Sequence, residues 1–169
     1  MFQGRAGAED GGRMITREGY AACAEALAPA MKRVAMSILR AGCDADDAVQ
    51  QALENVWEKR ESVDEARLNG YLMRVVVNEC RNIQRKRMRV FPVAELPEGA
   101  YEPPESRLRE AIDALPETLR TPLLLHYMEG YPEREICRIL SLSAPRLKSR
   151  LFRARRKLRR AIETEGMES

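Results

Sequence analysis

Apolar residues recur at helical spacing along most of the chain, and no stretch of useful length alternates apolar and polar positions as a strand would. Thr16 is the expected N-cap of the first helix, and Pro29 suits the first position of a second helix that Gly42 would end. Asp44 is expected to cap the third helix. The first half of the chain is therefore predicted to hold four helices, over 16–28, 29–40, 45–59 and 67–87.

The helical pattern stops between Val90 and Pro104, where four prolines, Pro104 included, and a glycine stand among acids. This composition predicts a semi-extended linker. The pattern restarts at Ser106 and predicts further helices over 106–115, 116–128, 131–140 and 144–163. We therefore predict an all-α protein of two small helical domains joined by a linker, the C-terminal one a helix-turn-helix. The expected boundaries are a disordered tail over 1–14, a domain over 15–89, the linker over 90–104 and a second domain over 105–165.

Charge is distributed unevenly, although the net charge of the 169 residues is only +3. The segment 81–89 contains five basic residues and no acid, and the segment 146–160 contains nine basic residues and no acid. Acids gather elsewhere, at Asp44, Asp46 and Asp47 and between Glu95 and Glu110. Two separate basic blocks predict two contacts with a polyanion.

The segment 130–160 has the pattern of a helix-turn-helix. A short helix, a three-residue turn at 141–143 and a long helix follow one another. The apolar positions expected to keep the long helix on the core are Leu147, Leu151, Ala154, Leu158 and Ile162. The start of such a helix faces base edges in a DNA major groove about 12 Å wide, and its flanks face phosphates. The predicted DNA contacts are Arg146, Lys148, Ser149, Arg150 and Arg153. Absence of an aromatic-rich sheet or GxxG loop disfavours RNA as the alternative ligand.

The chain offers no catalytic set, because it has a single His, scattered acids and no Gly-rich phosphate loop. We therefore expect neither an enzyme nor a cofactor. Cys23, Cys43, Cys80 and Cys137 stand singly without a CxxC pair, which predicts small buried thiols in a reducing cytoplasm and no metal site. No apolar run approaches the ~20 residues that span a bilayer, and no signal peptide is evident. The expected location is cytoplasmic, without membrane insertion.

Three stretches together resemble the extracytoplasmic function (ECF) group of the sigma-70 family of bacterial RNA polymerase sigma factors. Residues 44–57 (DADDAVQQAL, then VW) resemble the polymerase-binding helix of that family. Residues 70–87 (GYLMRVVVN through RKR) resemble its −10 element helix. Residues 115–158, from Leu-Pro to SRLFRARRKL, resemble its −35 reading domain. The resemblance covers about 16–162, and the order and spacing of the three stretches are more specific than any one of them.

The resemblance implies a sigma factor that directs core RNA polymerase to specific promoters and initiates transcription. It also implies an anti-sigma factor that covers the DNA- and polymerase-binding faces. The implied core polymerase contacts are Asp46, Asp47 and Gln50. Near the melted −10 strand it implies Asn78, Asn82 and Arg85, with Arg81, Lys86 and Arg87 on backbone phosphates. The loop 60–66 would help to hold a flipped-out base, which costs a few kcal/mol of lost stacking.

The sequence departs from the family at four positions. Asn82 replaces a frequent Asp, Tyr71 a frequent Trp, and Ser141 and Pro145 the usual Gly residues. These departures bear on promoter preference more than on the general function. Asp46 and Asp47 have a simpler interpretation as acids that favour a helix N-terminus, and Asn78 as a satisfied polar residue between packed helices.

Two other functions fit the same residues. One is a stand-alone helix-turn-helix regulator that binds an operator without polymerase, although no dimerisation helix is evident. The other is a decoy module that binds an anti-sigma factor, and its activity would survive loss of the basic residues.

Overall fold

The computed structural model describes residues 14–90 and 107–166 of the protein. Over these residues the chain is helical and contains no strand, so the predicted all-α fold is confirmed. Two single 3-10 turns, η1 (Arg60–Ser62) and η2 (Glu65–Arg67), connect the second and third helices. The helices are α1 (Arg17–Leu39), α2 (Gly42–Glu58), α3 (Leu68–Val90), α4 (Arg107–Asp113), α5 (Glu117–Tyr127), α6 (Glu133–Leu140) and α7 (Ala144–Gly166).

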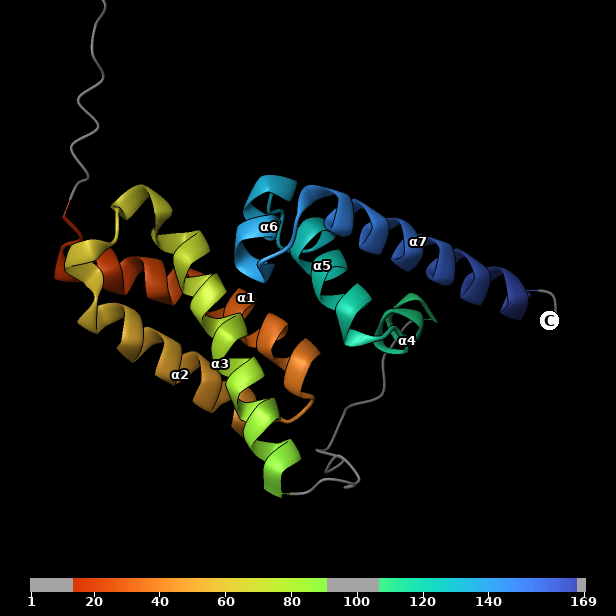
Figure 1. The fold of residues 1–169 in the computed structure, drawn as a ribbon, viewed down its shortest axis with the longest axis horizontal. Coiled ribbons are helices and arrows are strands. Elements are labelled where there is room, and N and C mark those ends of the chain that lie inside the picture. Colours follow the sequence, from red (N-terminus) through yellow and green to blue (C-terminus); the bar gives the residue numbers. More distant parts are fainter. Residues whose placement is uncertain (1–13, 91–106, 167–169) are drawn as a thin grey trace, which may run out of the picture.

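Helices α1, α2 and α3 pack against one another and form the N-terminal unit (Figure 1). Thr16 caps α1 as predicted, because its hydroxyl accepts a hydrogen bond from the Gly19 amide at 3.0 Å. On α2 the small residues Ala45, Ala48 and Ala52 are fully buried, which allows this helix to lie close to its neighbours.

The predicted break at Pro29 is wrong, because α1 is one helix of 23 residues. Pro29 is exposed and removes only one backbone donor, while the apolar positions on both sides of it, such as Leu27 and Met31, enter the same core. The end predicted at Arg40 lies one residue from the observed end at Leu39, but the capping roles predicted for Gly42 and Asp44 are wrong. Arg40 ends α1 in a left-handed conformation (φ 54°), Gly42 begins α2, and Asp44 lies in its first turn.

Helices α4 to α7 form the C-terminal unit, in which α7 packs against α4, α5 and α6 (Figure 1). The predicted helix-turn-helix is confirmed as α6, a turn at 141–143, and α7. Leu147, Leu151 and Ala154 are buried as predicted. Ile162 is 49% exposed, so its predicted place in the core is wrong. By that residue α7 has run past the helices that cover its apolar side.

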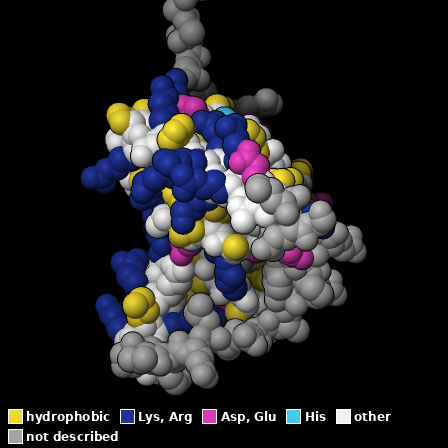
Figure 2. Space-filling model, turned by 90° about the vertical axis from the view of Figure 1, so that its right-hand side faces the viewer, with side chains coloured by type: hydrophobic (Ala, Val, Ile, Leu, Met, Phe, Trp, Pro, Cys, Tyr) yellow, Lys and Arg dark blue, Asp and Glu magenta, His cyan; other side chains and the backbone are white. Residues whose placement is uncertain are grey.

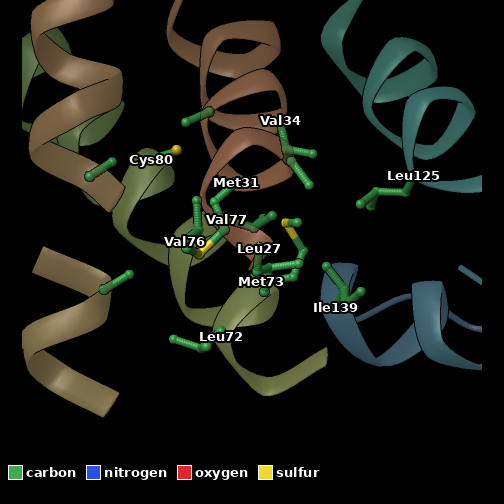
Figure 3. Close-up of a cluster of buried hydrophobic side chains, with 14 of the residues drawn as sticks. Leu27, Met31, Val34, Leu72, Met73, Val76, Val77, Cys80, Leu125 and Ile139 are labelled. Atoms are coloured by element: carbon green, nitrogen blue, oxygen red, sulfur yellow. The ribbon is translucent and has the colours of Figure 1, made fainter. Parts of the chain in front are cut away.

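The two units pack against each other through a shared apolar core. Helix α3 contacts α6, and α1 contacts α5. Figure 3 shows Leu125 of α5 and Ile139 of α6 facing α1 and α3, where Val34 and Met73 lie. All four side chains are fully buried. We call this packed state of the two units the closed arrangement.

The tail predicted over 1–14 lies outside the described residues except for Met14. The linker predicted over 90–104 also lies outside them except for Val90, which is the last residue of α3. None of the helices in the described ranges has the length and apolar character that crossing a membrane requires.

Candidate nucleic-acid interface

The solvent side of α7 carries the residues predicted to read duplex DNA. The buried apolar positions hold its other side on the core, so the basic side chains point outward. Seen from the side on which α7 ends, dark blue Lys and Arg side chains gather with few acids among them (Figure 2). Four of the five predicted contacts are exposed and the fifth, Arg150, is half-buried; the exposed ones are Arg146, Lys148, Ser149 and Arg153.

Arg150 lies among other arginines. Burial lowers the pKa of its guanidinium, and the positive charges of Arg153, Arg81 and Arg146 lower it further. Arg81 belongs to α3, so the cationic surfaces of the two units influence each other in the closed arrangement.

Helix α3 presents the residues predicted for the opened −10 strand. Asn78, Arg85 and Lys86 are exposed, and Asn82 is half-buried and accepts a hydrogen bond from Arg85 Nη2 at 2.5 Å. Because Asn78 faces solvent, its alternative interpretation as a polar residue between packed helices is wrong. The exposed amide leaves Asn78 accessible to a base.

Two predicted phosphate contacts on α3 already have partners within the protein. Arg81 is half-buried and Nη2 lies 3.5 Å from the Leu140 carbonyl of α6. Arg87 forms an ion pair with Asp44 and donates to the Leu39 carbonyl at 3.5 Å. Arg87 therefore ties the last part of α3 to the α1–α2 corner.

The predicted polymerase contacts lie on the exposed side of α2, opposite its buried alanines. Asp46 pairs with Lys32 at 2.9 Å across to α1, with both side chains more than half exposed. Asp47 is exposed, and the exposed Gln50 donates to Glu54 Oε1 at 3.1 Å. Because an exposed ion pair contributes little to stability, about 0–1 kcal/mol, Asp46 can exchange Lys32 for a cation on a partner protein.

Aromatic stacking fixes the corner between α2 and α3. The rings of Tyr20 and Trp57 lie 5.1 Å apart, and the Arg60 guanidinium lies over the Trp57 ring at 4.0 Å from its centroid. The Tyr20 hydroxyl donates to the Leu53 carbonyl at 2.5 Å, and burial raises the pKa of Tyr20 to about 12. The loop predicted over 60–66 thus starts from a rigid base.

Polar contacts between the two units are the part of the site that sequence reasoning missed. Arg33 of α1 holds the Glu129 carboxylate with two hydrogen bonds of 2.8 and 2.9 Å. The Tyr131 hydroxyl donates to Asn69 Oδ1 at 2.5 Å. Each pair joins residues more than 60 positions apart, and no local pattern marks such a contact.

Arg120 is the central missed residue. Its side chain is only 3% exposed, and it donates to the Ser37 carbonyl of α1 at 3.0 Å and to the Asp113 and Leu115 carbonyls at 3.0 and 2.5 Å. Burial lowers the pKa of Arg120 to about 10, so the guanidinium stays charged at neutral pH. A buried cation shared by carbonyls of both units holds them in one orientation.

The cysteines only partly match their prediction as buried thiols. Cys80 is fully buried, and burial raises its pKa to about 12. Cys23 and Cys137 are half-buried, while Cys43 is exposed, so the prediction is wrong for Cys43. In the parts of the chain that the structure describes, no group of His, Cys, Asp or Glu is arranged to hold a metal ion.

Comparison with known families places both units. Residues 23–90 match the family described as Sigma-70 region 2, and residues 105–158 match the family described as Sigma-70, region 4. The first match spans α2, α3 and most of α1, and the second spans α4 to α6 and the basic part of α7.

Individual relatives are sigma factors as well. The chain is 30% identical over 142 residues to the ECF RNA polymerase sigma factor SigM of Mycobacterium tuberculosis, covering 78% of this chain and 71% of that protein. It is 29% identical over 134 residues to the RNA polymerase sigma-E factor of Streptomyces antibioticus, covering 75% and 74% of the two chains.

Solved structures show the same fold. The sigma factor RpoE of Bartonella quintana, solved with the anti-sigma factor NepR, has a TM-score of 0.72 at 23% identity and covers 86% of this chain and 98% of its own. CnrH, solved with the cytosolic domain of CnrY, has a TM-score of 0.65 at 21% identity, with 88% and 90% covered. With two adjoining sigma-70 regions in order and a close match to SigM, this chain belongs to the ECF group of the sigma-70 family of RNA polymerase sigma factors.

Proposed function

We propose that the three exposed surfaces described above divide the work of a sigma factor between them. The acidic side of α2 docks on core RNA polymerase through Asp46, Asp47 and Gln50. Helix α3 and the corner at 60–66 hold the opened −10 strand. Helix α7 binds the −35 duplex, with Arg146 and Arg150 toward base edges. The proposed strand contacts are Asn78, Asn82, Arg81, Arg85, Lys86 and Arg87, and the other proposed duplex contacts are Lys148, Ser149 and Arg153.

One observation carries this division. The two basic surfaces belong to different helical units, and each faces solvent while the opposite side of its helix is buried. A helix in that position can enter a major groove, and exposed amides on a second helix can bond unstacked bases. A protein that binds only duplex DNA would need the first of these surfaces but not the second.

The closed arrangement must open for this work. The −35 and −10 elements are ~25 base pairs apart, which is about 85 Å of duplex at ~3.4 Å per pair. Arg81 of α3 and Arg150 of α7 line one and the same cavity. The closed protein therefore cannot reach both elements, and we propose that polymerase binding separates the units.

An anti-sigma factor is the proposed regulator. RpoE and CnrH share this fold. RpoE was solved with the anti-sigma factor NepR, and CnrH was solved with the cytosolic domain of CnrY. A partner that stabilised the closed arrangement would block promoter binding without covering every contact residue. We further propose that the protein works in the cytoplasm and catalyses no reaction of its own, because no described surface assembles a catalytic set.

Run-off transcription with core polymerase tests the proposal. We expect promoter-specific transcripts only when this protein is added. Arg150→Ala is expected to weaken −35 binding by ~1–3 kcal/mol and to relax one base preference. Arg160→Ala, a matched change on the exposed distal part of α7, is expected to leave base preference unchanged.

Three outcomes would count against the assignment. A uniform loss across sequences for Arg150→Ala would make Arg150 a phosphate contact. No specific initiation across a broad promoter library would reject the division of labour itself, whereas operator binding by the free protein would favour a stand-alone regulator.

A further inference from the structure

A small cavity lies between the two units where the basic surfaces of α3 and α7 adjoin. Its volume is about 230 Å³, and helices from both units line it. This is room for several water molecules, each of which occupies about 30 Å³ in the liquid. The cavity exists only while the units are packed together, because α3 supplies one wall and α5 and α7 supply another.

Like charges face each other across this cavity. Arg81 enters from α3 and Arg150 from α7. Glu117 is the acid of the lining, and its carboxylate accepts a hydrogen bond from Gln84 Nε2 at 2.8 Å. The lining therefore carries one net positive charge. Arg146 and Arg153 stand close enough to lower the pKa of Arg150 further, so the surroundings add positive potential.

A buried hydroxyl without a partner lies in the same lining. Thr121 is 4% exposed, and its Oγ1 makes no hydrogen bond within the protein. A buried polar atom nearly always has a partner, because leaving it unpaired costs the free energy of its lost hydration. Less than 1 Å² of Thr121 Oγ1 is accessible, so rotation about the Cα–Cβ bond has to turn this unused donor toward the cavity that Thr121 lines. Arg81 and Arg150 line the same cavity, and Arg81 bonds only the neutral Leu140 carbonyl there.

We propose that this cavity is a binding site for a phosphate-type oxyanion, held by Arg81, Arg150 and Thr121. Guanidinium groups donate charge-assisted hydrogen bonds in the geometry that phosphate oxygens accept, and the hydroxyl adds a neutral donor. The anion would bridge the two units and cancel the repulsion between their arginines. It would therefore shift the population toward the closed arrangement, because it binds that state alone.

The source of the anion can be a free phosphorylated small molecule or a backbone phosphate of DNA, since both present the same oxygens. The negative charge of Glu117 repels an anion from either source, while Arg81 and Arg150 attract it. Single substitutions can therefore raise or lower the affinity for the anion. Arg81 and Arg150 are also promoter contacts in the proposed function, whereas Thr121 is not. Phosphate binding by the free protein and promoter-specific transcription are separate measurements, so each can fail while the other succeeds.

Titration of the full-length protein with inorganic phosphate, at constant ionic strength kept by chloride, tests the site. We expect saturable binding by calorimetry, weakened about tenfold in Arg81→Gln and in Arg150→Gln. Thr121→Val, which keeps shape but loses the hydroxyl, should weaken it several-fold, while Thr121→Ser retains it and Glu117→Gln strengthens it. The matched controls Arg160→Gln and Thr164→Val, on the distal part of α7, should bind as the unchanged protein does.

Two further measurements separate the explanations. Phosphate should lower the radius of gyration seen by small-angle X-ray scattering, and Thr121→Val should reduce that response. If a DNA duplex of unrelated sequence shows the same dependence on Thr121 while free phosphate and pyrophosphate do not bind, the occupant is a backbone phosphate. Equal phosphate affinity in Thr121→Val and the unchanged protein would overturn the site. An equal loss of phosphate affinity in Arg160→Gln and Arg150→Gln would also overturn it, because it would indicate diffuse charge attraction. The same holds if neither phosphate binding nor duplex binding depends on any of these side chains.

Discussion

Ser141 occupies a backbone conformation that suits glycine better than serine. It ends α6 with φ 54° and ψ 48°, in the left-handed region, and its amide donates to the Cys137 carbonyl. A side chain in this region costs about 1 kcal/mol, and Ser141 stands where the family that the sequence resembles usually has Gly. The turn keeps its shape because Leu142 and α7 fix the chain on the other side.

Ser141→Gly should therefore stabilise the protein. We expect the free energy of unfolding to rise by about 0.5 kcal/mol, because relief of strain exceeds the added freedom of the unfolded chain. Urea denaturation measures it. Ser143→Gly, two residues later, serves as the control and should lower stability, so a rise in both variants would contradict the explanation.

Arg120 differs from Ser141, because its charge is costly to bury and its removal is expected to lower the free energy of unfolding. Arg120→Ala would remove the Arg120 donor from the Ser37 and Leu115 carbonyls, while the Asp113 carbonyl would keep its hydrogen bond from Arg40 Nη2. We expect the free energy of unfolding to fall by about 3 kcal/mol, measured by urea denaturation. Arg134→Ala, an exposed arginine on α6, should change it by less than about 0.5 kcal/mol. Similar effects in the two variants would show that the carbonyls find water instead.

Single residues differ in how well their roles could be read from sequence. The exposure of Arg146 and Arg153 follows from the helical period, because the apolar positions fix which side of α7 is buried. The burial of Arg120 could not be foreseen. One of its acceptors lies 83 positions away, and a lone Arg on a helix ordinarily faces solvent.

Helix α1 continues through a proline, a residue that usually ends or kinks a helix. A proline in the interior of a helix costs about 3 kcal/mol relative to alanine. Because of this cost, two helices are predicted from the sequence, with a break at Pro29. Packing of both halves against α2 and α3 outweighs it. The other helices were predicted in the right order, with ends that differ by a few residues, because their apolar stripes are interrupted by Gly, Pro and acids.

Pro29→Ala tests the balance in α1. Alanine restores an amide that can donate to the Glu25 carbonyl, and Pro29 is exposed, so little packing is lost. We expect the free energy of unfolding to rise by about 1–3 kcal/mol, measured by thermal or urea denaturation. Pro132→Ala is the control, because Pro132 is the N-cap of α6 and breaks no helical hydrogen bond there. No gain in Pro29→Ala would mean that α1 accommodates Pro29 without the usual cost of a proline in a helix.

At the scale of the whole molecule, the two units are packed into the closed arrangement, which has to open under the proposed function. Sequence predicted the units but not their packing, since the apolar residues that join them follow the same period as those inside each unit. The polar contacts that fix the orientation, Arg33 with Glu129 and Tyr131 with Asn69, link distant parts of the chain.

Arg33→Glu should open the molecule. It places two carboxylates opposite each other where a two-bond ion pair stood, and Glu129 is only 7% exposed. A loss of about 1 kcal/mol shifts the closed population about fivefold toward the open one. Small-angle scattering should record a larger radius of gyration, and Glu129→Arg should do the same. The charge-swapped double variant should return to the compact value; if it stays expanded, the pair does not control closure.

The shared apolar core also makes the closed arrangement sensitive to temperature. Separation of α5 and α6 from α1 and α3 hydrates Leu125, Ile139, Val34 and Met73, which are fully buried. Hydration of such surface raises the heat capacity, and apolar association weakens on cooling. Cooling should therefore loosen the contact between the two units, and under the proposed function the fraction of molecules able to span a promoter should grow at low temperature.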